Sequence, residues 1–156
     1  MNTNQVIQTQ IINEADTLLI GIGNNGRNDD GLGWAFIDAI RMDKRFKGQM
    51  EYRYQLQVED AELISHARQV IFVDAYEGQL EDGFKWQKCT PSNEFSFTTH
   101  EVPPDSILYL CEDLYQKSPN VYLMMIEGES WELKIGMTDT AKKNLQKALS
   151  FFKRAI

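Results

Sequence analysis

Residues 17–33, TLLIGIGNNGRNDDGLG, decide the fold of this chain. The first seven of them form a short apolar run that ends in glycines, which is typical of a buried β-strand. Apolar residues then recur at helical spacing over residues 32–40, and Asp29 and Asp30 stand where that helix would begin. A strand, a glycine-rich loop and a helix in this order predict an α/β fold.

The rest of the chain continues this alternation of strand-like and helix-like patterns. Further strands are predicted over residues 50–58, 70–73, 83–90, 95–98 and 121–126, with 83–90 near an edge of the sheet. A short helix is predicted over residues 59–68. A second helix is predicted to begin at Pro103-Pro104 and to bury Ile107, Leu108, Cys111, Leu114 and Tyr115. A third is predicted to begin after Thr138, its N-cap, and to bury Ala141, Leu145, Ala148, Leu149 and Phe152. Uniformly apolar strands between amphipathic helices favour a mostly parallel, twisted sheet of about five strands, covered on both faces.

Composition favours one cytoplasmic, monomeric domain. A chain of 156 residues with 42% hydrophobic and 25% charged residues suits a single core, with residues 1–15 as a polar N-terminal extension. The net charge of -7 disfavours nucleic acid and anionic membranes as partners and favours a basic peptide or a cation. No apolar run reaches the roughly 18 residues of a membrane span, and residues 1–15 lack the basic start and apolar middle expected of a signal peptide. Cys89 and Cys111, outside any CxxC pair, are expected to be buried thiols.

Candidate site residues gather where strands end. Ligands of parallel sheets bind at the carboxyl edge of the strands, where Asp30 and Asp74 are both expected. A carboxylate beside buried residues is costly unless it is paired or coordinated. His100 stands on a predicted loop, so the three side chains could offer two oxygens and one nitrogen to Ni²⁺ or Zn²⁺. His66, near the end of a predicted helix, is expected to be structural.

Other interpretations of these residues remain open. GxGxxG over residues 21–26 could bind a nucleotide, but Asp29 and Asp30 would repel its phosphates by about 4 kcal/mol per charge pair at about 4 Å. The two acids could instead cap the helix, and Asp74 could cap the loop that follows it. No catalytic triad, HExxH motif or GxSxG elbow favours another hydrolase class.

Three motifs together resemble the NiFe-hydrogenase maturation proteases. Residues 19–33 resemble the family signature, an apolar strand, GxGN, four residues and D[DE]GxG; Val73-Asp74-Ala75 and then His100 follow in the family's order. The resemblance implies a three-layer α/β/α fold in which Asp30, Asp74 and His100 bind a metal. It also implies cleavage of the C-terminal tail of a hydrogenase large-subunit precursor, with the metal being nickel supplied by that substrate. Zinc or cadmium could occupy the site in vitro.

The resemblance also suggests a mechanism and one departure from it. The metal would polarise the scissile carbonyl and activate a water, with Asp29 as the general base ahead of Asp74, so the expected catalytic set is Asp29, Asp30, Asp74 and His100. Residues 125–130, MIEGES, replace the Gly-Ile-Gln-Pro-like segment usual in the family, which leaves the identity of the precursor open. A nickel chaperone or sensor without peptidase activity, or a nucleotide-dependent enzyme, are the competing functions.

Overall fold

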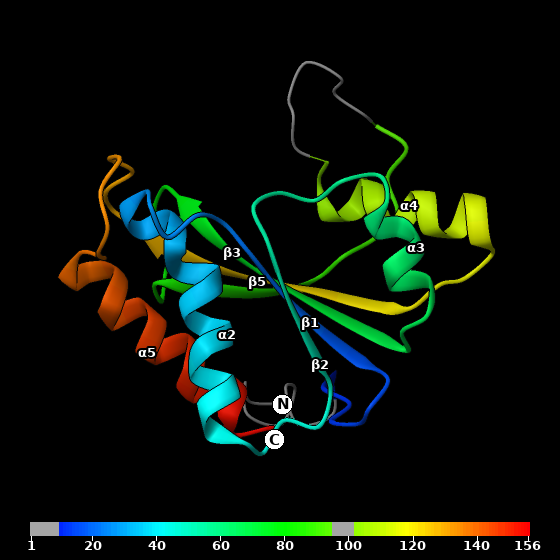
Figure 1. The fold of residues 1–156 in the computed structure, drawn as a ribbon, viewed down its shortest axis with the longest axis horizontal. Coiled ribbons are helices and arrows are strands. Elements are labelled where there is room, and N and C mark those ends of the chain that lie inside the picture. Colours follow the sequence, from blue (N-terminus) through cyan, green and yellow to red (C-terminus); the bar gives the residue numbers. More distant parts are fainter. Residues whose placement is uncertain (1–9, 95–101) are drawn as a thin grey trace.

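The computed structural model describes residues 10–94 and 102–156. Within them one sheet has the strand order β2-β1-β3-β5-β4, in which β4 alone is antiparallel and lies at an edge (Figure 1). The strands are β1 (Thr17–Ile22), β2 (Gln49–Arg53), β3 (Gln69–Glu77), β4 (Phe84–Lys88) and β5 (Asn120–Gly128). The helices are the 3-10 turn η1 (Asn28–Gly31), α2 (Leu32–Asp43), α3 (Asp60–Ser65), α4 (Pro104–Tyr115) and α5 (Asp139–Lys153).

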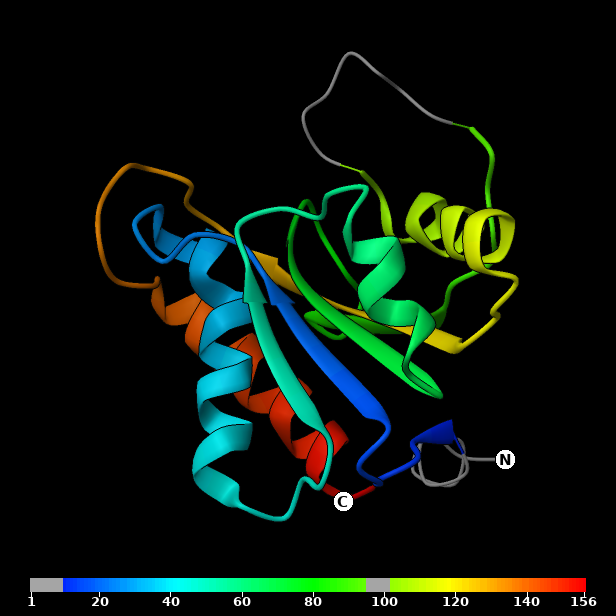
Figure 2. The same cartoon turned by 45° about the vertical axis from the view of Figure 1, so that its right-hand side comes forward.

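The elements form three layers, as the sequence predicts. Helices α2 and α5 cover one face of the sheet, and α3 and α4 cover the other (Figure 2). Alternate residues of β3 serve the two cores, because successive side chains of a strand point to opposite faces: Ile71 and Val73 pack toward α2 and α5, whereas Val70 and Phe72 pack toward α3 and α4. No helix in the described part of the chain is long and apolar enough to span a membrane.

Several predicted details are confirmed and others are wrong. The apolar stripe of α5 is buried as expected, and Thr138 Oγ1 accepts a hydrogen bond from Ala141 N at 3.2 Å. On α4, however, Leu114 and Tyr115 are exposed, because the last turn of this helix projects beyond α3 and the sheet (Figure 1). The second strand ends at Arg53 rather than at residue 58, and the strand predicted at 95–98 lies outside the described residues. Cys89 and Cys111 are buried free thiols, as predicted.

The N-terminal segment is part of the packed structure from Gln10 onward. Ile11 is buried in the core under α2 and α5. The side chain of Gln10 accepts a hydrogen bond from Trp86 Nε1 at 2.7 Å, and Ile12 N donates to the Gln69 side chain at 2.7 Å. Residues 10–12 therefore cover the sheet near β3 and β4, which corrects the expectation of a polar extension for these positions.

Helix α2 approaches the sheet closely because its second residue is glycine. A Cβ on Gly33 would lie 2.4 Å from the carbonyl oxygen of Ile22 and 2.6 Å from that of Val73. These are rigid backbone atoms of two central strands, so the helix would have to move away. The end of β1 and the start of α2 are thus fixed against each other at the edge where Asp30 and Asp74 lie.

We expect Gly33→Ala to lower the free energy of unfolding by about 1–3 kcal/mol, the range for overpacking a dense core. Chemical denaturation of the purified variant measures the change. Gly26→Ala, in the loop that precedes η1, is the matched control, since its Cβ would meet only the side-chain oxygen of Asn24 at 3.2 Å. Equal stability of the two variants would contradict the close approach of α2.

Candidate functional site

Most backbone amides of the glycine-rich loop donate hydrogen bonds to other groups of the protein. Gly23 N donates to Arg53 O at 2.9 Å, and Asn24 N donates to Asp30 O at 3.0 Å. Gly26 N is held by the Asn24 side chain at 2.9 Å. The amides of residues 27–30 also donate to protein carbonyls, those of Asn24, Lys134, Ser130 and Arg27. A phosphate site needs free amides at the start of the helix. This geometry argues against the nucleotide interpretation.

Gly23 is required for the close packing of the loop against the end of β1. Its φ is +144°, a value that L-amino acids with side chains rarely adopt, and an added Cβ would lie 1.9 Å from Asp30 O. The loop therefore folds back onto the end of β1 and brings the backbone of Asp30 against it. The GxG pattern here positions an acidic residue instead of cradling an anion.

Asp29 is fully buried and its carboxylate is saturated with hydrogen bonds. It accepts from Glu129 N at 2.7 Å, from Ser130 N at 3.0 Å and, at 2.8 Å each, from Thr138 N and Thr138 Oγ1. Burial raises the pKa of this carboxyl, but the hydrogen bonds outweigh burial and hold the pKa below its usual value. A buried carboxylate with a lowered pKa and four donors is a poor proton acceptor. These contacts argue against Asp29 as the general base.

Asp29 does not cap its own helix either. Neither η1 nor α2 has a side-chain hydrogen bond at its N-cap. Asp29 instead ties η1 to the segment between β5 and α5, and Asn28 adds to this tie, with its side chain donating to Gly136 O at 2.7 Å and accepting from Ser130 Oγ at 2.9 Å. Sequence reasoning missed Asn28 and Ser130 as structural residues. Asn28 has a φ of +49°, where asparagine is enriched, but no local pattern announces its distant partners.

Asp30 and Asp74 both lie at the end of β1. The carboxyl carbon of Asp30 is 3.8 Å from where a Cβ on Gly23 would lie, directly after that strand. In β3, Val73 pairs with Gly21, so Asp74 follows in register beside Ile22. The strand continues to Glu77, which corrects the expectation that Asp74 ends it, although the fully buried part of β3 does stop at Val73. Both side chains are half-buried.

Asp74 lines an open pocket of about 270 Å³. The pocket is also lined by Ile22, by Gln55 and Leu56 after β2, and by residues 102–104 before and at the start of α4. Val102 follows the third predicted ligand, His100, by two residues, but His100 itself lies outside the described residues. Within residues 10–94 and 102–156, no group of three or more His, Cys, Asp or Glu side chains is placed to hold a metal. The predicted three-ligand site stays a prediction.

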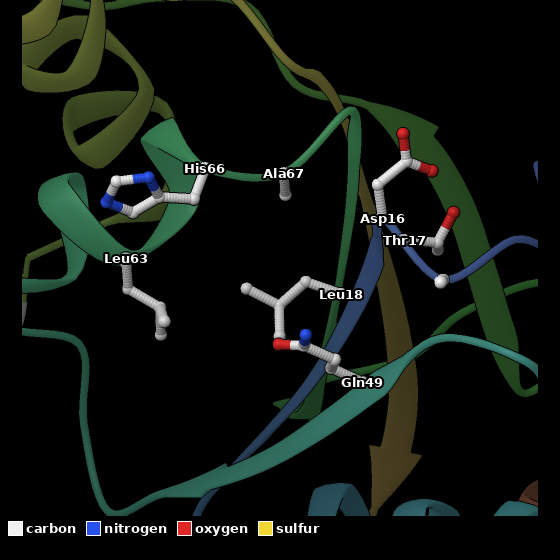
Figure 3. A pocket seen from close by; sticks show the side chains of 8 residues that line it. Asp16, Thr17, Leu18, Gln49, Leu63, His66 and Ala67 are labelled. Atoms are coloured by element: carbon white, nitrogen blue, oxygen red, sulfur yellow. The ribbon is translucent and has the colours of Figure 1, made fainter.

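A second pocket, of about 230 Å³, lies at the opposite edge of the sheet, where β1 and β2 begin. His66 and Asp16 lie on opposite sides of it, with Leu18 between them (Figure 3). His66 directly follows α3, as predicted, and its Nε2 is 2.8 Å from Glu62 Oε1 one helical turn earlier. The polar groups do not converge, so this pocket is a weaker candidate than the one at Asp74.

Comparison with known proteins supports the fold. No family model matches the chain, and no curated protein matches its sequence. The maturation protease HycI from Thermococcus kodakarensis matches with a TM-score of 0.68 and 17% identity over 96% of this chain and 98% of that one. The hydrogenase maturating endopeptidase HybD from Escherichia coli matches with a TM-score of 0.60 and 17% identity over 86% and 87%. A hydrogenase 2 maturation peptidase from a Thaumarchaeota archaeon gives 0.63 and 17% over 89% and 96%. This chain has the fold of these proteases.

Proposed function

We propose that the chain is a metal-dependent endopeptidase that removes the C-terminal tail of a nickel-loaded NiFe-hydrogenase large-subunit precursor. The observation that carries the proposal is the placement of Asp30 and Asp74 beside the end of β1, in a fold shared with maturation proteases over most of the chain. Two motifs separated by more than 40 residues in the sequence thus meet at one edge of the sheet.

The two carboxylates fit a divalent cation carried by a partner. Both are half-buried at one edge of the sheet, where Asp74 lines a pocket, and carboxylate oxygens are ligands for such ions. His100 is proposed as the third ligand. In this proposal the nickel belongs to the substrate, so the chain completes the coordination of an ion already partly held by the precursor; zinc or cadmium would replace it in vitro.

Because the carboxylate of Asp29 already accepts four hydrogen bonds, we assign the role of general base to another residue. A water attacks the scissile carbonyl carbon, and a carboxylate accepts its proton and returns it to the departing amine. Asp74, half-buried and lining a pocket, is proposed for this step in place of Asp29, with one carboxylate oxygen for the ion and the other for the proton. Cys89 is no alternative nucleophile, because burial raises the pKa of its thiol to about 12.

The deciding experiment incubates the purified chain with nickel-loaded and with nickel-free precursor and follows loss of the tail by mass spectrometry. We expect the loaded precursor to be cut at least tenfold faster, because nickel can control cleavage only if the chain binds the loaded precursor more tightly than the empty one. Reagents that block serine or cysteine nucleophiles should leave the rate unchanged. Cutting of empty precursor at the same rate would overturn this control by nickel, and binding of loaded precursor without cutting would favour the chaperone.

A further inference from the structure

The segment between β5 and α5 exposes two large apolar side chains. Leu133 is 81% exposed and Ile135 is 88% exposed, more than any other large hydrophobic residue in the described part of the chain. A cavity of about 340 Å³ lies beside Ile135 and is bounded on the α2 side by Trp34 and Ala35. Isolated exposed apolar residues are ordinary, but two on one short loop next to an open cavity resemble a binding surface.

The protein holds this loop in a fixed shape. Asn28 N donates to Lys134 O at 2.8 Å, and the Asn28 side chain donates to Gly136 O at 2.7 Å, so the carbonyls on both sides of Ile135 are held. Asp29 binds the two ends of the loop through Glu129 and Thr138. A surface that is ordered before binding loses less entropy when a partner arrives.

The loop lies at the same edge of the sheet as the candidate site, and this edge is acidic. Arg53 there is paired with Asp60 at 3.0 Å and Lys134 with Glu132 at 3.3 Å, so these charges offset one another. Arg27, which donates to Trp131 O, and Lys142, which lines the cavity beside Ile135, are further basic residues of this edge. The other acids of this edge outnumber these two bases and include Asp30, Glu59, Asp74, Glu77 and Glu129. A segment that passes over Leu133 and Ile135 to Asp74 must therefore cross a negative field, which favours basic residues.

We propose that Leu133 and Ile135 form the docking surface for the precursor, which lays an apolar side chain on them and turns basic residues toward the acidic edge. This inference rests on the proposed function and adds the chemistry of the docking segment: apolar and basic together. The cavity beside Ile135 receives the apolar side chain, and the acids draw the chain toward Asp74.

The test uses the double variant Leu133→Ser/Ile135→Ser with nickel-loaded precursor. We expect KM to rise at least tenfold while kcat and the melting temperature stay unchanged, because both side chains are exposed and neither lies at the reacting atoms. Met42→Ser is the matched control: Met42 is 78% exposed, but it lies in the last turn of α2, at the opposite edge of the sheet.

Two substitutions of opposite charge at Ile135 test whether the docking segment is basic. Ile135→Lys and Ile135→Glu both remove the apolar side chain, so a basic partner should suffer a larger KM with lysine than with glutamate, and the difference should shrink in high salt. Equal values would overturn the charge argument.

The other outcomes separate this inference from the proposed function. Unchanged KM in the double variant, with normal cleavage by the wild type, would overturn the docking surface and leave the function standing. Neither binding nor cleavage by the wild type would reject the function and the docking surface with it. If the double variant only abolishes self-association, the surface serves a second copy and the inference is wrong.

Discussion

Asp29→Asn should lower the melting temperature by about 4–16 °C, whereas Asp30→Asn should leave it unchanged or raise it. The amide introduced by Asp29→Asn would turn an NH₂ group toward N–H donors that now point at a carboxylate, and an unsatisfied buried polar group costs about 2–4 kcal/mol when charge is involved. A loss of 1 kcal/mol corresponds to about 2–4 °C in a domain of this size. Thermal unfolding of the two variants at neutral pH measures the contrast.

The pH dependence of the difference in melting temperature between wild type and Asp29→Asn provides a second measurement. The pKa of Asp29 is lower in the folded protein than its unfolded value of about 3.9. Its stabilising contribution is therefore fully present above the unfolded pKa and disappears as pH falls through the folded pKa. The melting temperatures of wild type and Asp29→Asn should then converge in acid. Equal melting temperatures at pH 7 would show that Asp29 does not hold the β5–α5 loop.

The architecture could be predicted from the sequence because the evidence for it is local. The central strands are short apolar runs, and α5 shows its buried face at regular helical spacing. Asp30 and Asp74 could be placed at the same edge for a related reason, since the sequence pattern puts both near the carboxyl ends of strands in a parallel sheet. Each of these inferences needs only a window of residues and the rules of sheet connection.

The role of Asp29 could not be predicted because its partners are distant in the sequence. Glu129 and Ser130 lie 100 and 101 residues away along the chain. From the sequence alone, Asp29 and Asp30 are equivalent acids before a helix. The fold separates them: one is buried beneath the β5–α5 loop, and the other lies half-buried against the end of β1.

Ile11 illustrates the same limit at the N-terminus. Apart from Ile12, the residues around it are polar, and the sequence therefore predicts an extension there. The structure satisfies those polar groups through partners far along the chain, since Gln10 meets Trp86 and Gln69 bonds both Ile12 N and Gln10 O. Ile11 can therefore be buried although the residues around it show neither helical nor strand periodicity, so the sequence pattern does not predict its burial.

Asp30→Asn and Asp74→Asn should each reduce cleavage of nickel-loaded precursor by about 10²–10³-fold, the loss seen when one group that stabilises charge in a transition state is removed. Neither change should lower the melting temperature, because both side chains are half-buried and residues kept for function often cost stability rather than add to it. Glu81→Gln removes the same charge from an exposed residue that follows β3 and should cleave normally.

Calorimetry with Cd²⁺ separates a ligand from a residue that merely touches the precursor. We expect one site per chain in the wild type, weakened at least tenfold by Asp30→Asn, Asp74→Asn or His100→Ala, because each loses one donor to the ion. Unchanged affinity in all three variants would remove the metal site from the proposal. A drop of several degrees in the melting temperature of Asp30→Asn would instead show that this acid, like its neighbour Asp29, serves the loop rather than the reaction.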